Sequence, residues 1–142
     1  MGYAKSFRDL FVYQQARDLS KEVFVLSKQF PKEETYALTD QIRRSSRSIG
    51  AQIAEAWAKR RYEKHFISKL TDADGEQQET QHWLETAVDC GYLTPQHAQK
   101  VLAKCQRIGR LLGGMMAKSD KFCAQANVLR ESAPEYFVNG ER

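Results

Sequence analysis

Residues 40–66, DQIRRSSRSIGAQIAEAWAKRRYEKHF, combine a helical pattern of apolar residues with a dense set of positive charges. Apolar and small residues recur at steps of four and three, which is the core-facing seam of an antiparallel helix bundle. The seam consists of Leu38, Ile42, Ser45, Ile49, Ile53 and Ala56. Seven basic residues accompany it, namely Arg43, Arg44, Arg47, Lys59, Arg60, Arg61 and Lys64. The stretch therefore predicts a bundle helix with a basic patch on its surface.

The same period extends over most of the chain and predicts helices at about residues 9–29, 34–61, 63–90 and 95–121. Phe30-Pro31 ends the first helix, Gly91 terminates the third, and Thr94-Pro95 starts the fourth as N-cap and first helical residue. Short connections force neighbouring helices antiparallel, so the predicted fold is all-α, an up-down-up-down four-helix bundle. Residues 1–123 form its single domain, and residues 124–142, where the period is lost, are predicted to be a loosely attached tail.

The other three helices each have an apolar seam of their own. The first seam is Val12, Ala16, Leu19, Val23, Leu26 and Phe30. The third helix supplies Phe66, Leu70, Ala73, Gln77, Thr80, Leu84 and Ala87, and the fourth Ala98, Val101, Cys105, Ile108, Leu112 and Met115. Polar Gln77 and Thr80 interrupt an apolar row, so we expect them to fix the helix register through buried hydrogen bonds.

The composition is that of an ordinary globular chain, with 142 residues, 42% hydrophobic and 28% charged residues and a net charge of +4. This mildly basic balance favours anionic partners. No apolar run reaches the ~18 residues of a membrane span, and the N-terminus lacks the apolar region of a signal peptide. Three cysteines without close spacing indicate reduced thiols and a cytoplasmic location.

Some large residues lie off the predicted seams. They are Tyr13, Phe24, Trp57 and Trp83. Either they widen the apolar stripes that flank a single core, or they form a second apolar face that packs against another subunit. In the fourth helix, Gly109-x-x-x-Gly113 indicates either close helix approach or local fraying.

No catalytic constellation is recognisable, so the sequence predicts a protein that is not an enzyme. Glu79-x-x-His82 has the spacing used in di-iron bundles, but such sites need two of these motifs and two further glutamates. We therefore expect no metal and no cofactor.

Several motifs, in order and at compatible spacing, resemble a known family over about residues 7–117. They are Phe7-Arg8-Asp9-Leu10 with Tyr13-Gln14 and Ala16; Phe30-Pro31 with Glu34, Tyr36 and Leu38-Thr39; Gln41-Ile42-Arg43-Arg44; Ser48-Ile49 and Ile53-Ala54-Glu55; Glu79-Thr80-Gln81 with Leu84; and Gly91-Tyr92-Leu93. The chain resembles the small bacterial four-helix bundle proteins encoded within intervening sequences of large-subunit ribosomal RNA. Gln52 and Ala56 depart from the family's usual Asn and Gly.

This resemblance implies a four-helix bundle that assembles as a homo-oligomeric ring, a pentamer. The family includes relatives of the accessory protein of diversity-generating retroelements, which binds nucleic acid and a reverse transcriptase. Most members of the branch that this chain resembles have no established activity. The departures at Gln52 and Ala56 put in doubt any role that depends on the family's Asn and Gly.

Two functions follow from these patterns. In the first, the basic patch binds the backbone of RNA or DNA nonspecifically, with steep salt dependence. Arg43, Arg44 and Arg47 could instead be neutralised by the acidic residues 72–79 across the bundle. In the second, the protein is an interaction scaffold or an accessory partner of a bacterial enzyme such as a reverse transcriptase, with an exposed apolar or acidic groove at the third helix.

Overall fold

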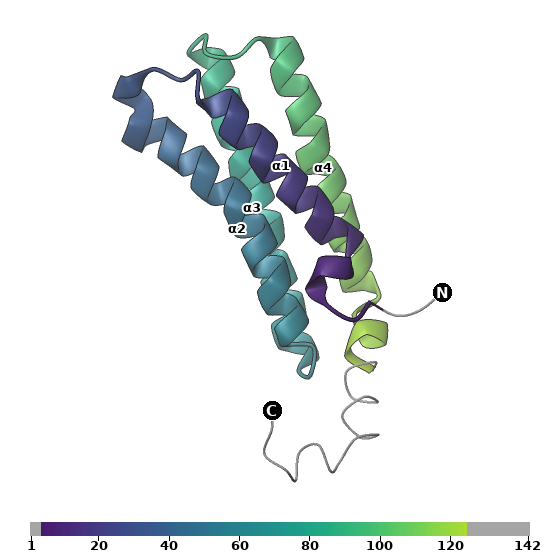
Figure 1. Cartoon of the computed structure of the whole chain (residues 1–142). Helices are drawn as coiled ribbons and strands as arrows, with labels where there is room; N and C mark the ends of the chain where they lie inside the picture. The colour runs from purple at the N-terminus through teal and green to yellow at the C-terminus, as the bar shows by residue number, and fades with distance from the viewer. Residues whose placement is uncertain (1–3, 125–142) are drawn as a thin grey trace.

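Four long helices run along one another in the computed structural model, which describes residues 4–124 (Figure 1). They are α1 (Phe11–Ser27), α2 (Asp40–Ala58), α3 (Glu63–Asp89) and α4 (Pro95–Ala117). Short turns precede α1 and α2: η1 (Phe7–Asp9), η2 (Lys32–Glu34) and η3 (Thr35–Thr39). The predicted all-α bundle is confirmed. The predicted tail, residues 124–142, lies outside the described residues except for Ala124.

The predicted seams form the core. Every seam residue of α1, α2 and α3, together with Leu38 and Phe30 beside them, is at most 8% exposed, and on α4 only Met115 is partly exposed. Burial on this scale supplies the main driving force for folding. Thr80 makes the predicted buried contact between helices, because its Oγ1 lies 2.8 Å from Ser45 Oγ of α2. Gln77 differs from the prediction, because it donates to Asp74 Oδ1 at 2.9 Å and accepts from Gln81, both within α3.

The helix boundaries follow the local signals of the sequence. Gly91 has φ +79°, and Tyr92 N–H donates to the Ala87 carbonyl, the bond that closes a Schellman motif. Thr94 Oγ1 accepts from His97 N–H at 3.1 Å, so the predicted N-cap of α4 is confirmed. The connections leave room only for antiparallel neighbours, as the sequence indicated.

Two of the predicted helices have boundaries that differ from the observed ones. The second does not run as one α-helix from residue 34, because η3 is a π-helical turn before α2. Its wider winding turns both Leu38 and Thr39 into the protein interior. The fourth helix ends at Ala117 rather than near Lys121, and residues 119–124 form a separate helical turn after a break at Lys118. Gly113 and Gly114 weaken the last turns of α4.

Candidate functional site

Four cations from α1 and α2 surround one exposed aromatic face of the bundle. Phe24, which is 36% exposed, carries Lys28 Nζ at 4.7 Å, Arg43 Cζ at 4.7 Å and Arg47 Cζ at 5.6 Å from its ring centroid. About two turns earlier on α1, Arg17 Nη1 donates to Tyr13 Oη at 3.3 Å. We call Arg17, Lys28, Arg43 and Arg47 the basic surface. These contacts are cation–π interactions, which hold guanidinium groups without neutralising them.

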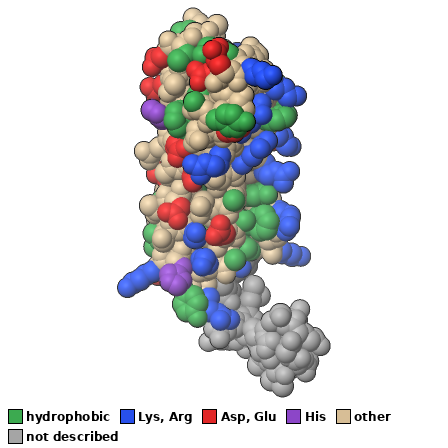
Figure 2. All heavy atoms as spheres, turned by 90° about the vertical axis from the view of Figure 1, so that its left-hand side faces the viewer, with side chains coloured by type: hydrophobic (Ala, Val, Ile, Leu, Met, Phe, Trp, Pro, Cys, Tyr) green, Lys and Arg blue, Asp and Glu red, His purple; other side chains and the backbone are tan. Residues whose placement is uncertain are grey.

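Figure 2 shows the charge distribution on the α2 side of the bundle. Lys and Arg side chains gather along its right-hand edge, whereas Asp and Glu side chains lie over its middle and left. Arg43 Nε donates to the buried Ser27 Oγ at 2.8 Å, so this arginine is directed from α2 toward α1. The hydrogen bond to Tyr13 raises the pKa of Arg17, which like any arginine is a cation at neutral pH.

Two hollows flank Arg47 on this surface. The first, of about 530 Å³, is formed by α2 alone, and we call it the arginine hollow. Its lining is Asp40, Arg43, Arg44, Arg47, Ser48 and Ala51. The second, of about 380 Å³, lies between α1 and α2, and we call it the Tyr13 hollow. Its lining is Phe7, Tyr13, Ala16, Arg17, Ser20, Arg47, Gly50, Ala51 and Ala54.

The seven predicted basic residues do not form one patch. Arg43 and Arg47 are one helical turn apart and face α1, while Arg44 points toward α3 and lies 3.8 Å from Glu79. The remaining four, Lys59, Arg60, Arg61 and Lys64, lie at the connection between α2 and α3. With a rise of 1.5 Å per residue, Arg47 and Lys59 are about 18 Å apart along the axis.

Arg60 is only partly exposed and packs on Trp57. Its Cζ lies 3.5 Å from the Trp57 ring centroid, and its Nε donates to the Trp57 carbonyl at 2.9 Å. Its Nη1 is buried and has no hydrogen-bond partner in the described part of the chain. Burial therefore lowers the pKa of Arg60. Lys59, Arg61 and Lys64 are exposed and form a second, separate basic cluster.

The expected neutralisation of arginines by α3 is limited to Arg44. Lys69 of α3 pairs with one acid from each helix: its Nζ lies 3.1 Å from Glu55 of α2 and 3.9 Å from Asp72 of α3. Glu76 has a buried Oε1 without a partner among the described residues, and burial together with the charge of Glu79 raises its pKa. The α1-facing arginines are thus separated from the acidic face.

Sequence reasoning missed Arg17 and Lys28, which α1 contributes to the basic surface. A signal was present, because each follows an aromatic residue by four positions: Tyr13 and Arg17, Phe24 and Lys28. Residues at this spacing are neighbours on one helix face. The prediction considered only the charges of the second helix and therefore did not include Arg17 and Lys28.

Of the four candidate interface residues, only Phe24 has an exposed ring. Tyr13, Trp57 and Trp83 are half-buried and pack against the chain's own core. Tyr13 contacts Phe7 edge-on at 4.8 Å, and Trp83 Nε1 donates to Glu79 Oε2 at 3.1 Å. Other large apolar side chains are exposed, namely Phe11, Val25, Tyr36 and Tyr62. A subunit interface stays a prediction.

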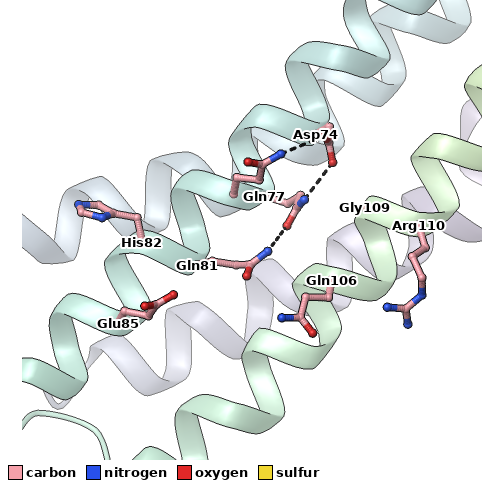
Figure 3. A pocket seen from close by; sticks show the side chains of 9 residues that line it. Asp74, Gln77, Gln81, His82, Glu85, Gln106, Gly109 and Arg110 are labelled. Carbon is pink, nitrogen blue, oxygen red and sulfur yellow. Dashed lines mark hydrogen bonds between the residues drawn. The ribbon is translucent and has the colours of Figure 1, made fainter.

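A polar groove of about 650 Å³ lies on another side of the bundle, between α3 and α4 (Figure 3). We call it the amide groove. Its lining is Asp74, Gln77, Gln78, Gln81, His82, Glu85, Gln106, Gly109 and Arg110. A Cβ on Gly109 would lie 2.8 Å from Gln77 Nε2, so glycine here permits the close approach that the sequence suggested. A Cβ on Gly113 would meet no heavy atom within 4 Å, so close packing does not require glycine at this position.

A directional chain of hydrogen bonds orders this groove. Gln77 and Gln78 donate to the two oxygens of Asp74 at 2.9 and 3.1 Å, and Gln81 Nε2 donates to Gln77 Oε1 at 2.7 Å (Figure 3). Because the Asp74 carboxylate only accepts, it draws the amide NH₂ groups inward. The Gln77 oxygen is thus occupied by Gln81, and the groove is lined by amide and carboxylate groups of α3, with Arg110 on the opposite helix.

Residues 4–124 contain no group of three or more His, Cys, Asp or Glu side chains arranged to hold a metal ion. None of the helices in this range is both long enough and apolar enough to cross a membrane. All three cysteines are free thiols, and burial raises the pKa of Cys105 to about 12.

Comparison with known proteins places the chain in a family. The model of the 23S rRNA-intervening sequence protein family matches residues 8–114. The chain belongs to this family. It is similar to a crystal structure of a protein of unknown function from the S23 ribosomal protein family of Bacteroides thetaiotaomicron, with 29% identity and a TM-score of 0.68. That alignment covers 75% of this chain and 95% of the other. None of the curated proteins matches.

The resemblance inferred from the motifs is therefore confirmed. The departures from the family pattern at Gln52 and Ala56 lie on α2. Gln52 Oε1 accepts from Lys69 Nζ at 3.3 Å, a link between α2 and α3, and Ala56 is 1% exposed. Both residues serve packing between the helices here. Neither lines the basic surface or the amide groove.

Proposed function

We propose that this chain is a non-enzymatic homo-oligomeric protein that binds the sugar–phosphate backbone of RNA or DNA without sequence preference. The oligomer would be pentameric, as the family resemblance implies, and cytoplasmic, which the three free thiols favour. Neither the family description nor that of the similar structure indicates a catalytic activity.

The observation that carries the proposal is how the basic surface is held. Its cations contact aromatic rings and hydroxyl groups, and none of them belongs to an ion pair within 4.0 Å in residues 4–124. The ion pairs of this range involve Arg44, Lys69 and Lys104. An arginine without a carboxylate partner retains its charge for phosphate, which its planar fork matches in geometry.

The proposed interface is a revision of the patch on residues 43–64. Arg43 and Arg47 remain in it, and Arg17 and Lys28 join them. The cluster of Lys59, Arg61 and Lys64 becomes a second contact about 18 Å away along α2. A ring of identical subunits would repeat both contacts, which raises the overall affinity through multivalency.

Binding of fluorescent single-stranded RNA and duplex DNA at two salt concentrations, with light scattering on the same samples, tests the proposal. Lys28→Glu with Arg47→Glu should reduce binding at low salt by at least about tenfold, since two attractive charges become repulsive. Arg43 is left intact because its bond to Ser27 belongs to the contact between α1 and α2. Lys100→Glu on α4 with Lys118→Glu directly after it changes the net charge equally and is the control.

The outcomes separate the parts of the proposal. Equal losses in both double variants would show that only net charge matters and would remove the basic surface. The double variant Arg61→Glu with Lys64→Glu tests in the same way whether the second cluster contributes to binding. A wild-type protein that binds no nucleic acid at low salt contradicts the function itself, and a monomeric scattering mass contradicts the oligomer.

One observation favours a second function, that of an accessory partner of a bacterial enzyme such as a reverse transcriptase, without nucleic-acid binding. The amide groove holds two carboxylates of the third helix, Asp74 and Glu85, beside glutamine amides. Such a groove suits a donor-rich, basic segment of another protein. A partner captured by wild-type protein should be lost from Asp74→Asn with Glu85→Gln and retained by Lys28→Glu with Arg47→Glu.

A further inference from the structure

We propose that the Tyr13 hollow receives a nucleobase of single-stranded nucleic acid while Arg17 and Arg47 hold the adjoining phosphate. This inference rests on the proposed function and deepens it, because backbone binding alone does not distinguish single strands from duplexes. The hollow would make the protein prefer a strand whose bases are unpaired.

The floor of the hollow is apolar, and small side chains create it. Ala16 of α1 and Gly50, Ala51 and Ala54 of α2 leave space that larger residues would fill. Tyr13 forms the aromatic wall and is itself fixed by an edge-on contact with Phe7, whose centroid lies 4.8 Å away. A rigid aromatic side chain beside an apolar floor is the environment in which nucleobases bind on single-strand-binding proteins.

The rim of the hollow is basic. Arg17 and Arg47 come from opposite helices, and Arg17 is anchored to Tyr13 by the 3.3 Å hydrogen bond. Arg47 also lines the arginine hollow, so a phosphate bound there would adjoin a second site with Arg43 and Arg44. An apolar floor inside a cationic rim matches a nucleotide, which has an aromatic base and an anionic phosphate.

The dimensions favour one base over a duplex. A volume of about 380 Å³ lies near the lower end of the range of roughly 300–1,000 Å³ found for small-molecule pockets. A base paired within a duplex could not enter it without unstacking, whereas a single strand presents its bases freely. The basic surface continues from this rim toward Arg43 and Lys28 at Phe24, which suits a strand that runs along α1 and α2.

Gly50 allows a test that does not damage the fold. A Cβ at this position would lie 3.5 Å from Tyr13 Cε1 and 3.9 Å from Tyr13 Cδ1, which is ordinary van der Waals contact. Gly50→Ala therefore fills part of the hollow without a clash. Gly75→Ala on α3 is the matched control, because a Cβ there meets nothing within 4 Å. Both changes replace a helical glycine, so both should raise the melting temperature similarly.

Ala51→Leu provides a larger obstruction on an exposed helix position, and Ala103→Leu on the exposed side of α4 is its control. The probes are a ten-nucleotide oligoadenylate and an abasic strand with the same number of phosphates. Wild-type protein should bind the oligoadenylate about fivefold or more tightly, the difference expected when one base makes an aromatic contact. Gly50→Ala should reduce that ratio and Ala51→Leu should bring it near one, whereas the controls retain it.

Equal wild-type affinity for both probes would overturn the base site while leaving backbone binding in place. A ratio that survives in both Gly50→Ala and Ala51→Leu would also overturn it. If neither probe binds at low salt, the proposed function fails, and this inference fails with it.

Discussion

The buried contact between Ser45 and Thr80 gives a stability prediction that can be worked from the structure. Both side chains are fully buried, one on α2 and one on α3, and their hydroxyl oxygens are 2.8 Å apart. Thr80 also lies 2.9 Å from the Glu76 carbonyl, to which it donates. Since each hydroxyl carries one proton, the Thr80 oxygen is left to accept from Ser45.

Removing either hydroxyl should lower the free energy of unfolding by about 1 kcal/mol. Thr80→Val preserves the shape but leaves the buried Ser45 hydroxyl with only the longer contact of 3.3 Å to the Ile42 carbonyl. Ser45→Ala removes the donor to Thr80. For a chain of this size, each change should lower the melting temperature by about 2–4 °C.

The double variant measures the bond itself. In the double variant, the second substitution removes a group that has already lost its partner. The double variant should therefore lose about 0.5–1 kcal/mol less free energy of unfolding than the two single variants lose together. Urea unfolding of the wild type and the three variants gives this coupling directly. Additivity within about 0.3 kcal/mol would refute the reasoning that this pair fixes the α2–α3 register.

Three further predictions concern single positions. On α4, the Gly113→Ala variant should be more stable than the Gly109→Ala variant by about 1 kcal/mol. Only a Cβ at Gly109 displaces Gln77 from Asp74. Equal melting temperatures of the two variants would contradict the close approach at Gly109. At about pH 8, a thiol reagent should modify the exposed Cys90 rapidly. It should modify Cys105 and Cys123 only after unfolding, since burial raises the pKa of these two thiols. Rapid modification of all three thiols in the native protein would contradict this. Tyr92 donates to Glu34 at 2.8 Å, a bond that raises its pKa from 10.0 to about 12. The folded chain holds this proton more tightly than the unfolded chain, so the stabilisation is complete below about pH 10 and is lost as the pH rises from about 10 to 12; Tyr92→Phe should flatten the fall of the urea midpoint in that window, and an unchanged fall would argue against the bond.

The fold could be predicted because its determinants are local. The apolar period fixes the buried face of each helix, and Gly91, Thr94 and Pro95 mark boundaries through backbone geometry that depends on few neighbours. The π-helical turn at residues 35–39 could not be predicted in this way. This turn buries both Leu38 and Thr39, two adjacent residues that an α-helical period would not place together on one face.

The candidate site was harder to predict because charge counting ignores direction. Arg43 and Arg47 share one face of α2, whereas Arg44 is rotated by about 100° and reaches α3. Arg60 lies over Trp57, three residues before it, a local contact that charge counting also overlooks. Arg17 and Lys28 became part of the surface only once α1 was placed beside α2.

The salt dependence of nucleic-acid affinity in Arg47→Gln tests the central claim most directly. Each phosphate contact of a single strand contributes about 0.7 to the slope of log affinity against log salt. If Arg47 of the basic surface contacts a phosphate, the slope of Arg47→Gln should be shallower than that of the wild type by about that amount for each bound subunit, and Lys100→Gln should leave it unchanged. Identical slopes for all three proteins would show that the surface between α1 and α2 does not bind the backbone.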